Sequence, residues 1–151
     1  MDILIKKRED LEKMVGEYIF HGSVNLFDIA KPHKAKCDTK NPKNEQFAIY
    51  GSTDLRFAVL FSFPKMPLKN YAWGVRLKEG KFVGVLNNNT YIEENAKGYI
   101  YCFNKKHFKP IEKGSSQYVC KYELCPEYVF EIKYKDFKDC FKKEKTELKE
   151  L

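Results

Sequence analysis

The stretch that decides the fold is Glu17-Tyr18-Ile19-Phe20-His21-Gly22-Ser23, a short apolar run that ends in a histidine, a glycine and a serine. Such a run predicts a β-strand from Tyr18 to His21. At the end of that strand the imidazole of His21 and the backbone amide of Gly22 would lie side by side. Glycine lets a ligand approach the amide closely, and a ring nitrogen can pair with a hydroxyl. The pair therefore suits a planar ligand that carries an amide and a sugar hydroxyl.

The composition predicts a single domain over residues 1–151. A chain of 151 residues with 43% hydrophobic and 15% aromatic residues can bury a core without disulfides. No stretch approaches the roughly 18 apolar residues that span a bilayer. The first seven residues also lack the charged-then-apolar order of a secretory signal. We therefore expect a cytoplasmic protein with no membrane partner.

The net charge of +7, from 28 basic and 21 acidic residues, can attract an anionic partner. The lysines, however, alternate with Glu and Asp along almost the whole chain. Only Arg8, Arg56 and Arg76 are arginines, whereas surfaces that read bases favour arginine for its two-point contacts. A solvated lysine-rich surface is therefore favoured over a dedicated nucleic-acid face, and nucleic acid stays an alternative partner.

The five cysteines are unevenly spaced, and Cys120 and Cys125 are too far apart for a CxxC motif. Reduced, partly buried thiols are the ordinary state of such residues. His33 and Cys37 could form half of a metal site, but no second pair follows them. The sequence therefore predicts no metal.

The remaining patterns predict short helices early in the chain and strands later. We expect an amphipathic helix from Lys7 to Val15, a helical turn over Asn25–Ala30, and a surface loop over 31–46. A further helix should run from Leu55 to Phe63, with Ser52 or Thr53 as its N-cap. The strand-like segments are Tyr18–His21, Phe47–Tyr50, Tyr71–Leu77, Lys81–Leu86, Gly98–Phe103, Gln117–Lys121 and Tyr128–Tyr134. This order predicts an α+β fold with mostly antiparallel sheets.

The last predicted strand carries a candidate catalytic carboxylate. Tyr128, Phe130 and Ile132 share one face of that strand by its period of two. Glu127 follows Pro126 and stands where the strand begins, at the rim of the sheet. A carboxylate at a strand rim is well placed for polar chemistry.

Three segments together resemble the ADP-ribosyltransferase superfamily, in its histidine–tyrosine–glutamate branch of diphtheria toxin and the poly(ADP-ribose) polymerases. They are Phe20-His21-Gly22-Ser23, then Ile49-Tyr50 with Phe61 eleven residues later, then Pro126-Glu127-Tyr128-Val129. In that family a strand ending His-Gly-Ser or His-Gly-Thr precedes an Ile-Tyr strand and a helix with a second tyrosine. A strand led by Glu-Tyr closes the site. The resemblance implies two small, mostly antiparallel sheets that form a cleft, with a few short helices.

The resemblance implies an NAD-dependent mono-ADP-ribosyltransferase, with NAD as its substrate and an unknown macromolecule or small molecule as acceptor; the basic net charge favours an acidic one. His21, Gly22, Ser23, Tyr50 and Phe61 would then line the NAD site. His21 would bond the nicotinamide ribose, the Gly22 backbone would hold the carboxamide, and the two aromatic rings would flank nicotinamide. With His21, Glu127 would be catalytic: its charge would stabilise the oxocarbenium-like state formed as nicotinamide leaves.

Several residues depart from the family's pattern and leave alternatives open. Phe61 stands where the family has a tyrosine, and keeps its ring without the hydroxyl. Ala58 stands where the polymerases have a serine that bonds the carboxamide. Glu123 and Glu131 are rivals of Glu127 for the acidic role. The alternative functions are a catalytically inactive nucleotide-binding module of the same fold and a basic nucleic-acid-binding domain.

Overall fold

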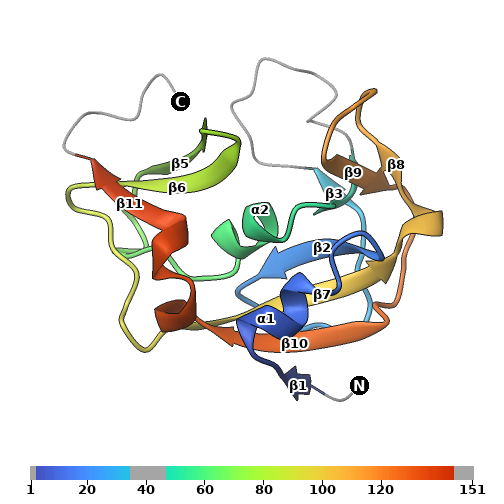
Figure 1. Cartoon of the computed structure of the whole chain (residues 1–151), viewed down its shortest axis with the longest axis horizontal. Coiled ribbons are helices and arrows are strands. Elements are labelled where there is room, and N and C mark those ends of the chain that lie inside the picture. The colour runs from blue at the N-terminus through green and yellow to red at the C-terminus, as the bar shows by residue number, and fades with distance from the viewer. Residues whose placement is uncertain (1–2, 35–46, 145–151) are drawn as a thin grey trace.

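Two sheets, two α-helices and several short 3-10 turns make up the structure, a computed structural model that describes residues 3–34 and 47–144 (Figure 1). The helices are α1 (Arg8–Glu12) and α2 (Leu55–Leu60). The strands are β1 (Ile3–Ile5), β2 (Tyr18–Ser23), β3 (His33–Lys34), β4 (Phe47–Ser52), β5 (Trp73–Lys78), β6 (Lys81–Asn87), β7 (Lys97–Asn104), β8 (Lys109–Pro110), β9 (Gln117–Cys120), β10 (Tyr128–Lys133) and β11 (Phe141–Glu144). The 3-10 turns are η2 (Lys105–His107), η3 (Tyr134–Asp136) and η4 (Lys138–Cys140). The mixed α+β class is thereby confirmed.

The larger sheet has the strand order β1-β10-β7-β2-β4-β9-β8, and β3 pairs with β4. The smaller sheet has the order β11-β6-β5. Most neighbouring strands are antiparallel, as the sequence predicts; β1 with β10 and β11 with β6 are the parallel pairs among the described strands. Helix α2 lies between the two sheets in Figure 1 and packs against β2, β4 and β6.

The central strands of the larger sheet are covered on both faces. Phe20, Ile100 and Phe130 belong to the core between this sheet, α2 and the smaller sheet, which we call the helix-side core. Tyr101 and Val129, on alternate positions of the same strands, belong to a second cluster, which we call the outer core. This two-sided burial explains why the β7 segment reads as a continuous apolar run rather than an alternating one.

The segment Asn25–Ala30 is not the predicted helical turn. The phenol of Tyr101 takes the backbone groups that such a turn would use: its hydroxyl accepts from the Phe27 N–H at 2.9 Å and donates to the Asn25 carbonyl at 2.7 Å. The Phe27 ring stacks on the Tyr101 ring with the centroids 3.9 Å apart. Ala30 then forms a bridge with Leu124. Tertiary contacts therefore extend this segment over the outer core.

The segment from β4 to α2 also departs from its prediction in detail. Strand β4 continues through Gly51 to Ser52, because Gly51 serves close packing rather than a turn: a Cβ there would lie 2.3 Å from Cγ2 of Ile19. The N-cap of α2 is Asp54, whose carboxylate accepts from the Phe57 N–H at 3.0 Å. The Ser52 hydroxyl instead accepts from the Asp54 N–H. The helix ends at Leu60, before the predicted Phe63.

The other strand predictions agree with the structure to within about two residues at most ends. Helix α1 is shorter than the predicted Lys7–Val15, and a turn leads from it to Gly16, whose φ of +98° favours glycine. Within the predicted 31–46 loop, His33 and Lys34 form β3, and residues 35–46 lie outside the described residues.

Candidate functional site

Strands β2 and β4 separate beside the His-Gly pair. Their register contains one pair, Phe20 with Ser52. Beyond it, β2 continues its pairing with β7 as far as Ser23 with Tyr99, and β4 continues its pairing with β9. The ladder between the two strands therefore ends one residue before His21, and the sheet divides there.

This separation leaves backbone groups of Gly22 directed at the gap. The Phe20 carbonyl oxygen lies 3.1 Å from a Cβ built on Gly51, so Phe20 directs its polar groups toward β4. In an antiparallel sheet, alternate residues direct their N–H and C=O groups to the same neighbour. Gly22 therefore directs its N–H and C=O to the same side as Phe20, past the last pair of the β2–β4 ladder. A ligand amide could bond both groups.

The imidazole of His21 lies in the same gap. Its Nδ1 is 2.6 Å from the carbonyl oxygen of Tyr50, a residue two positions before Ser52 that directs its carbonyl toward β2. Burial lowers the pKa of His21, an effect that outweighs the opposite influence of the Tyr50 carbonyl, so the ring is neutral at pH 7. A neutral imidazole whose Nδ1 donates to a carbonyl has Nε2 as its acceptor. His21 is therefore fixed as an acceptor for a hydroxyl.

The last turn of α2 lies directly on this part of the sheet. A Cβ on Gly22 would be 1.9 Å from the carbonyl oxygen of Ala58, and one on Gly98 of β7 would be 1.9 Å from that of Ser62. The absence of side chains at these two glycines on neighbouring strands therefore leaves room for the backbone at the end of α2. The Ser62 hydroxyl, which the sequence analysis did not single out, would lie 2.5 Å from the Cβ on Gly22. It bonds the carbonyls of Ala58 and Tyr99, so it fixes the helix end over Gly22.

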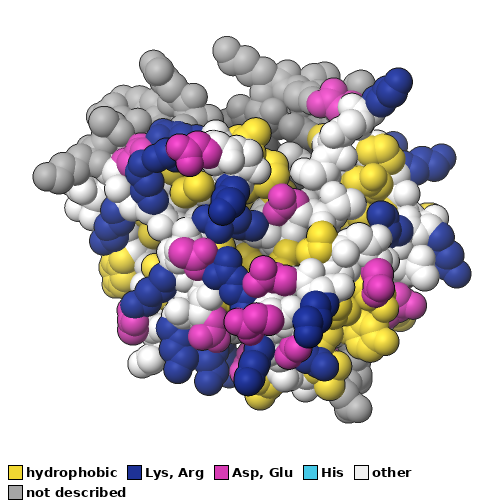
Figure 2. All heavy atoms as spheres, in the orientation of Figure 1, with side chains coloured by type: hydrophobic (Ala, Val, Ile, Leu, Met, Phe, Trp, Pro, Cys, Tyr) yellow, Lys and Arg dark blue, Asp and Glu magenta, His cyan; other side chains and the backbone are white. Residues whose placement is uncertain are grey.

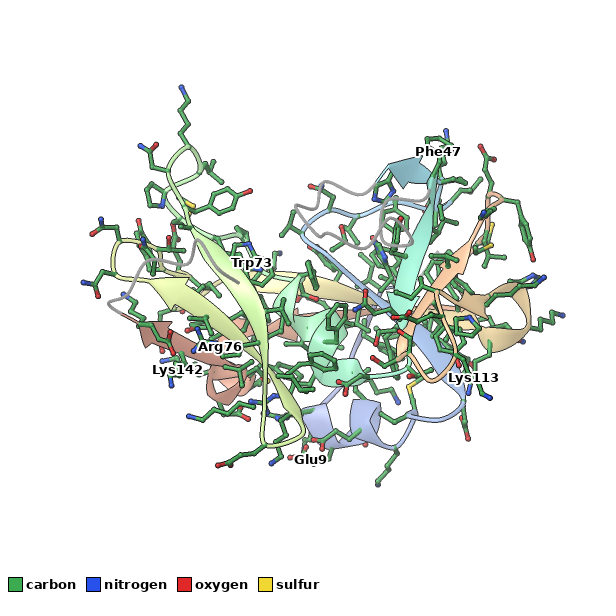
Figure 3. All side chains as sticks on the ribbon, turned by 90° about the horizontal axis from the view of Figure 1, so that it is seen from above. Glu9, Phe47, Trp73, Arg76, Lys113 and Lys142 are labelled. Atoms are coloured by element: carbon green, nitrogen blue, oxygen red, sulfur yellow. The ribbon has the colours of Figure 1, made fainter. Side chains whose placement is uncertain are left out.

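Phe61 directly precedes Ser62, whose hydroxyl lies over Gly22. Phe61 is the C-cap residue of α2, and 41% of it is exposed, so it is not a core residue. Its ring packs against that of Phe57 at a tilt of 51° and forms a T-shaped pair with Trp73, with the centroids 5.2 Å apart in both pairs. Figure 3 shows Trp73 on β5 pointing toward the middle of the molecule. The sequence analysis did not single out Trp73 as a site residue. That it is the one tryptophan of the chain was the signal that could have pointed to it.

Tyr50 and Ser23 lie at the borders of this arrangement. Tyr50 is half-buried against Ala48 and Val119, with its ring centroid 6.3 Å from that of His33. Ser23 ends β2, and its hydroxyl accepts from the Asn25 N–H. The structure thus brings Gly22 and Tyr50 to one gap between two strands, with His21 bridging it.

Glu127 lies elsewhere on the sheet. It precedes β10, and β7 and β2 stand between β10 and β4. Since His21 pairs with Tyr101 and Tyr101 with Val129, the Cα atoms of His21 and Glu127 are two strands and two residues apart, or about 12 Å. The Glu127 side chain is exposed, and its backbone N–H donates to the Cys102 carbonyl at 2.8 Å.

Of the rival carboxylates, Glu131 is closer to the gap than Glu127 by register, because it pairs with Tyr99 and Tyr99 pairs with Ser23. Glu131 is on β10 and lies 3.7 Å from the Lys97 ammonium. Glu123 is exposed next to Leu124, which pairs with Ala30. The strand on the far side of β4 is β9, and there the residue paired with Ser52 is Gln117, an amide. Sequence order alone did not distinguish these strand positions.

The surface has two hollows, and the first includes Phe27, whose ring centroid lies 5.9 Å from that of His21. One hollow of about 230 Å³ is lined by Ile3, Leu26, Phe27, Asp28 and Val129. Another of about 200 Å³ is lined by Leu86, Tyr91, Ile92, Glu94, Tyr134, Lys138, Phe141, Lys142 and Lys143. On the face in Figure 2, basic and acidic side chains are intermixed. That mixture matches the alternation of the two charges in the sequence.

The part of the chain that the structure describes has no group of three or more His, Cys, Asp or Glu residues that could hold a metal ion. Cys102, Cys120, Cys125 and Cys140 are free thiols, and Cys37 lies outside the described residues. Within residues 3–34 and 47–144, no helix is long and apolar enough to cross a membrane.

No protein-family model, no curated protein and no solved structure matches the chain.

Proposed function

We propose that the chain binds NAD at the gap between β2 and β4 and acts as an NAD-dependent mono-ADP-ribosyltransferase-like protein. The observation that carries this proposal is the end of the β2–β4 ladder at Phe20 and Ser52, which directs the backbone of Gly22 into the gap. Phe61, the residue before the Ser62 that lies over Gly22, has an exposed ring. Amide-pairing backbone groups next to an aromatic face suit nicotinamide, an aromatic ring with a carboxamide.

Binding would use three kinds of contact. The Gly22 N–H donates to the carboxamide oxygen, and the Gly22 carbonyl accepts from the carboxamide NH₂ group. The ring stacks on Phe61. A ribose hydroxyl donates to Nε2 of His21, the acceptor that the Nδ1–Tyr50 hydrogen bond leaves. Tyr50 and Ser23 border the same pocket.

Transfer breaks the glycosidic C–N bond of NAD. Nicotinamide leaves as a neutral ring with the electron pair of that bond, and the positive charge passes to the ribose as an oxocarbenium-like state. A carboxylate stabilises this charge, and the acceptor then attacks the ribose carbon. Glu127 is the proposed carboxylate. An acceptor of acidic character would complement the net charge of +7.

A second candidate function is NAD binding without transfer. The placement of Glu127 favours it, because β7 and β2 separate β10 from β4. Under this alternative the gap between β2 and β4 binds the ligand as described, and no carboxylate reaches the ribose.

Binding is tested by calorimetric titration of the protein with NAD. The Phe61→Leu variant should bind more weakly, by about 0.5–1.5 kcal/mol beyond the loss of area. Phe61→Tyr is the matched control that keeps the ring, and it should bind like the wild type. An absence of NAD binding by the wild type would refute the proposed function. Equal affinities for all three proteins would remove Phe61 from the site.

Transfer is tested by the release of nicotinamide from NAD. Glu127→Gln should lower turnover by about 10²-fold or more, with little change in NAD affinity. If Glu123→Gln abolishes turnover and Glu127→Gln does not, Glu123 is the acid. If the wild type binds NAD and releases no nicotinamide, the second candidate function is correct.

The nucleic-acid alternative is tested separately by measuring the affinity for an RNA or DNA oligonucleotide at several salt concentrations. A slope near zero in a plot of log affinity against log salt concentration would exclude many phosphate contacts.

A further inference from the structure

Lys65 is a buried lysine without a carboxylate partner in the described residues. It is 7% exposed, whereas lysines are almost never fully buried unless they are paired. Its ammonium donates a hydrogen bond to the carbonyl of Leu60, the last residue of α2. The same nitrogen lies 3.9 Å from the centre of the Trp73 ring and 5.8 Å from that of Phe141. The ammonium is therefore held between the end of a helix and the face of an indole.

The carboxylates of the surrounding elements are paired with cations other than Lys65. Arg56 of α2 bonds Asp139, the middle residue of η4. On β5 and β11, Arg76 and Lys142 both contact Glu144. Burial alone lowers the pKa of Lys65, to about 7. Both charge states of Lys65 are therefore populated near neutral pH.

Trp73 connects this lysine to the exposed aromatic surface. The Lys65 ammonium lies over the face of the indole, and the Phe61 ring meets the indole edge-on at 71°. A cation over the ring face attracts the indole only while the lysine is protonated. The hydrogen bond to Leu60, by contrast, can form in both charge states.

We propose that Lys65 is a positioning residue that holds the Trp73 indole against Phe61 and thereby orders the aromatic wall on which a planar ligand stacks. The effect on the ligand rests on the proposed NAD site, whereas the ordering of Trp73 does not. Protonation of Lys65 tightens the wall and its deprotonation loosens it. The affinity for NAD therefore falls as the pH rises through the pKa of Lys65.

The single tryptophan of the chain provides a direct readout. In the wild type we expect the Trp73 emission to titrate with a midpoint near pH 7, and acrylamide to quench it about twofold more at pH 8.5 than at pH 6.5. Lys65→Met should lose the titration and show the strongly quenched value at both pH values. Lys65→Arg keeps a cation throughout and should stay weakly quenched at both. Lys113→Met, far from Trp73 in Figure 3, is the matched control.

The NAD affinity of the same proteins gives the second readout. The dissociation constant of the wild type should rise about fivefold between pH 6.5 and 8.5, the scale of a cation–π contact. That of Lys65→Met should be high and independent of pH, while its melting temperature is no lower than that of the wild type. A merely structural role of Lys65 would not produce this pH profile.

The two proposals fail in different ways. A Trp73 emission that does not titrate between pH 6 and 8.5, or titrates equally in Lys65→Met, overturns the role of Lys65. So does an NAD affinity of Lys65→Met equal to that of the wild type at both pH values. If the Trp73 emission titrates and the titration depends on Lys65, but the protein does not bind NAD, the ordering of the wall is supported and the NAD site is refuted.

Discussion

Replacing Gly22 with alanine tests the contact that positions α2 on the sheet. A Cβ at this position would lie 1.9 Å from the Ala58 carbonyl oxygen, and real Cβ atoms essentially never approach another atom within 3.0 Å. The helix must therefore retreat by at least about 1.1 Å, the difference between these distances. The clashing atom belongs to the backbone, so no side-chain rotation can relieve the contact.

The cost should lie at the upper end of the range for overpacked sites, about 3 kcal/mol. In a chain of about 150 residues, each kcal/mol lowers the melting temperature by roughly 2–4 °C. We therefore expect Gly22→Ala to melt about 6–12 °C below the wild type. The same retreat moves Phe61, so the proposed NAD affinity should fall as well.

Thermal unfolding followed by circular dichroism measures this effect. Gly98→Ala is the companion variant, since its Cβ would meet the Ser62 carbonyl at the same 1.9 Å. Gly84→Ala is the control, because its nearest clash, at 2.7 Å, is with the ring of Phe141, a side chain that can turn. The reasoning is refuted if Gly22→Ala and Gly98→Ala melt at the wild-type temperature, or if Gly84→Ala is the least stable of the three.

Three further predictions concern the cap, the histidine and the thiols. Asp54→Ala should lower stability by about 1 kcal/mol by removing the cap on the Phe57 N–H, with recovery in Asp54→Ser; urea denaturation measures both. Burial lowers the pKa of His21 in the folded state, so the unfolded state binds more protons, and stability should fall as the pH drops below about 6.5; a His21→Gln variant with an unchanged pH dependence would contradict this. Burial raises the pKa of the Cys102 thiol to about 12, so iodoacetamide at pH 8 should label the exposed Cys125 well before Cys102, as peptide mass spectrometry can show.

Local pattern determined most of the elements. The alternation of apolar residues and the punctuation by Gly, Pro and Asn located the segments of β2, β5, β6, β7, β9 and β10 within about two residues at most ends. Their physical basis is short-range: a strand presents alternate residues to opposite faces, and turn residues tolerate the backbone angles that strands do not. The turn at Gly16, before β2, is of the same kind, since its φ is +98°.

Particular local choices were reversed by tertiary contacts. Gly51 looked like the end of a strand, yet β4 continues because the side chain of Ile19 fills the space that a Cβ would need. Asn25–Ala30 had the composition of a helical turn, yet the Tyr101 hydroxyl bonds two of its backbone groups. Ile19 and Tyr101 are far in sequence from the segments that they contact, so the local sequence of those segments could not predict these contacts.

The arrangement of the candidate site shows the same division. The sequence by itself determined that a strand ends in His21-Gly22 and that an aromatic strand and a helix with Phe61 follow. The tertiary structure alone decided which strands are neighbours, and it placed Glu127 at the start of β10, two strands beyond β2, with Gln117 opposite Ser52. It also decided that Trp73 contacts both Lys65 and Phe61. The order of strands in a sheet follows from long-range pairing and shared core packing, because residues far apart in sequence must bury the same apolar surface.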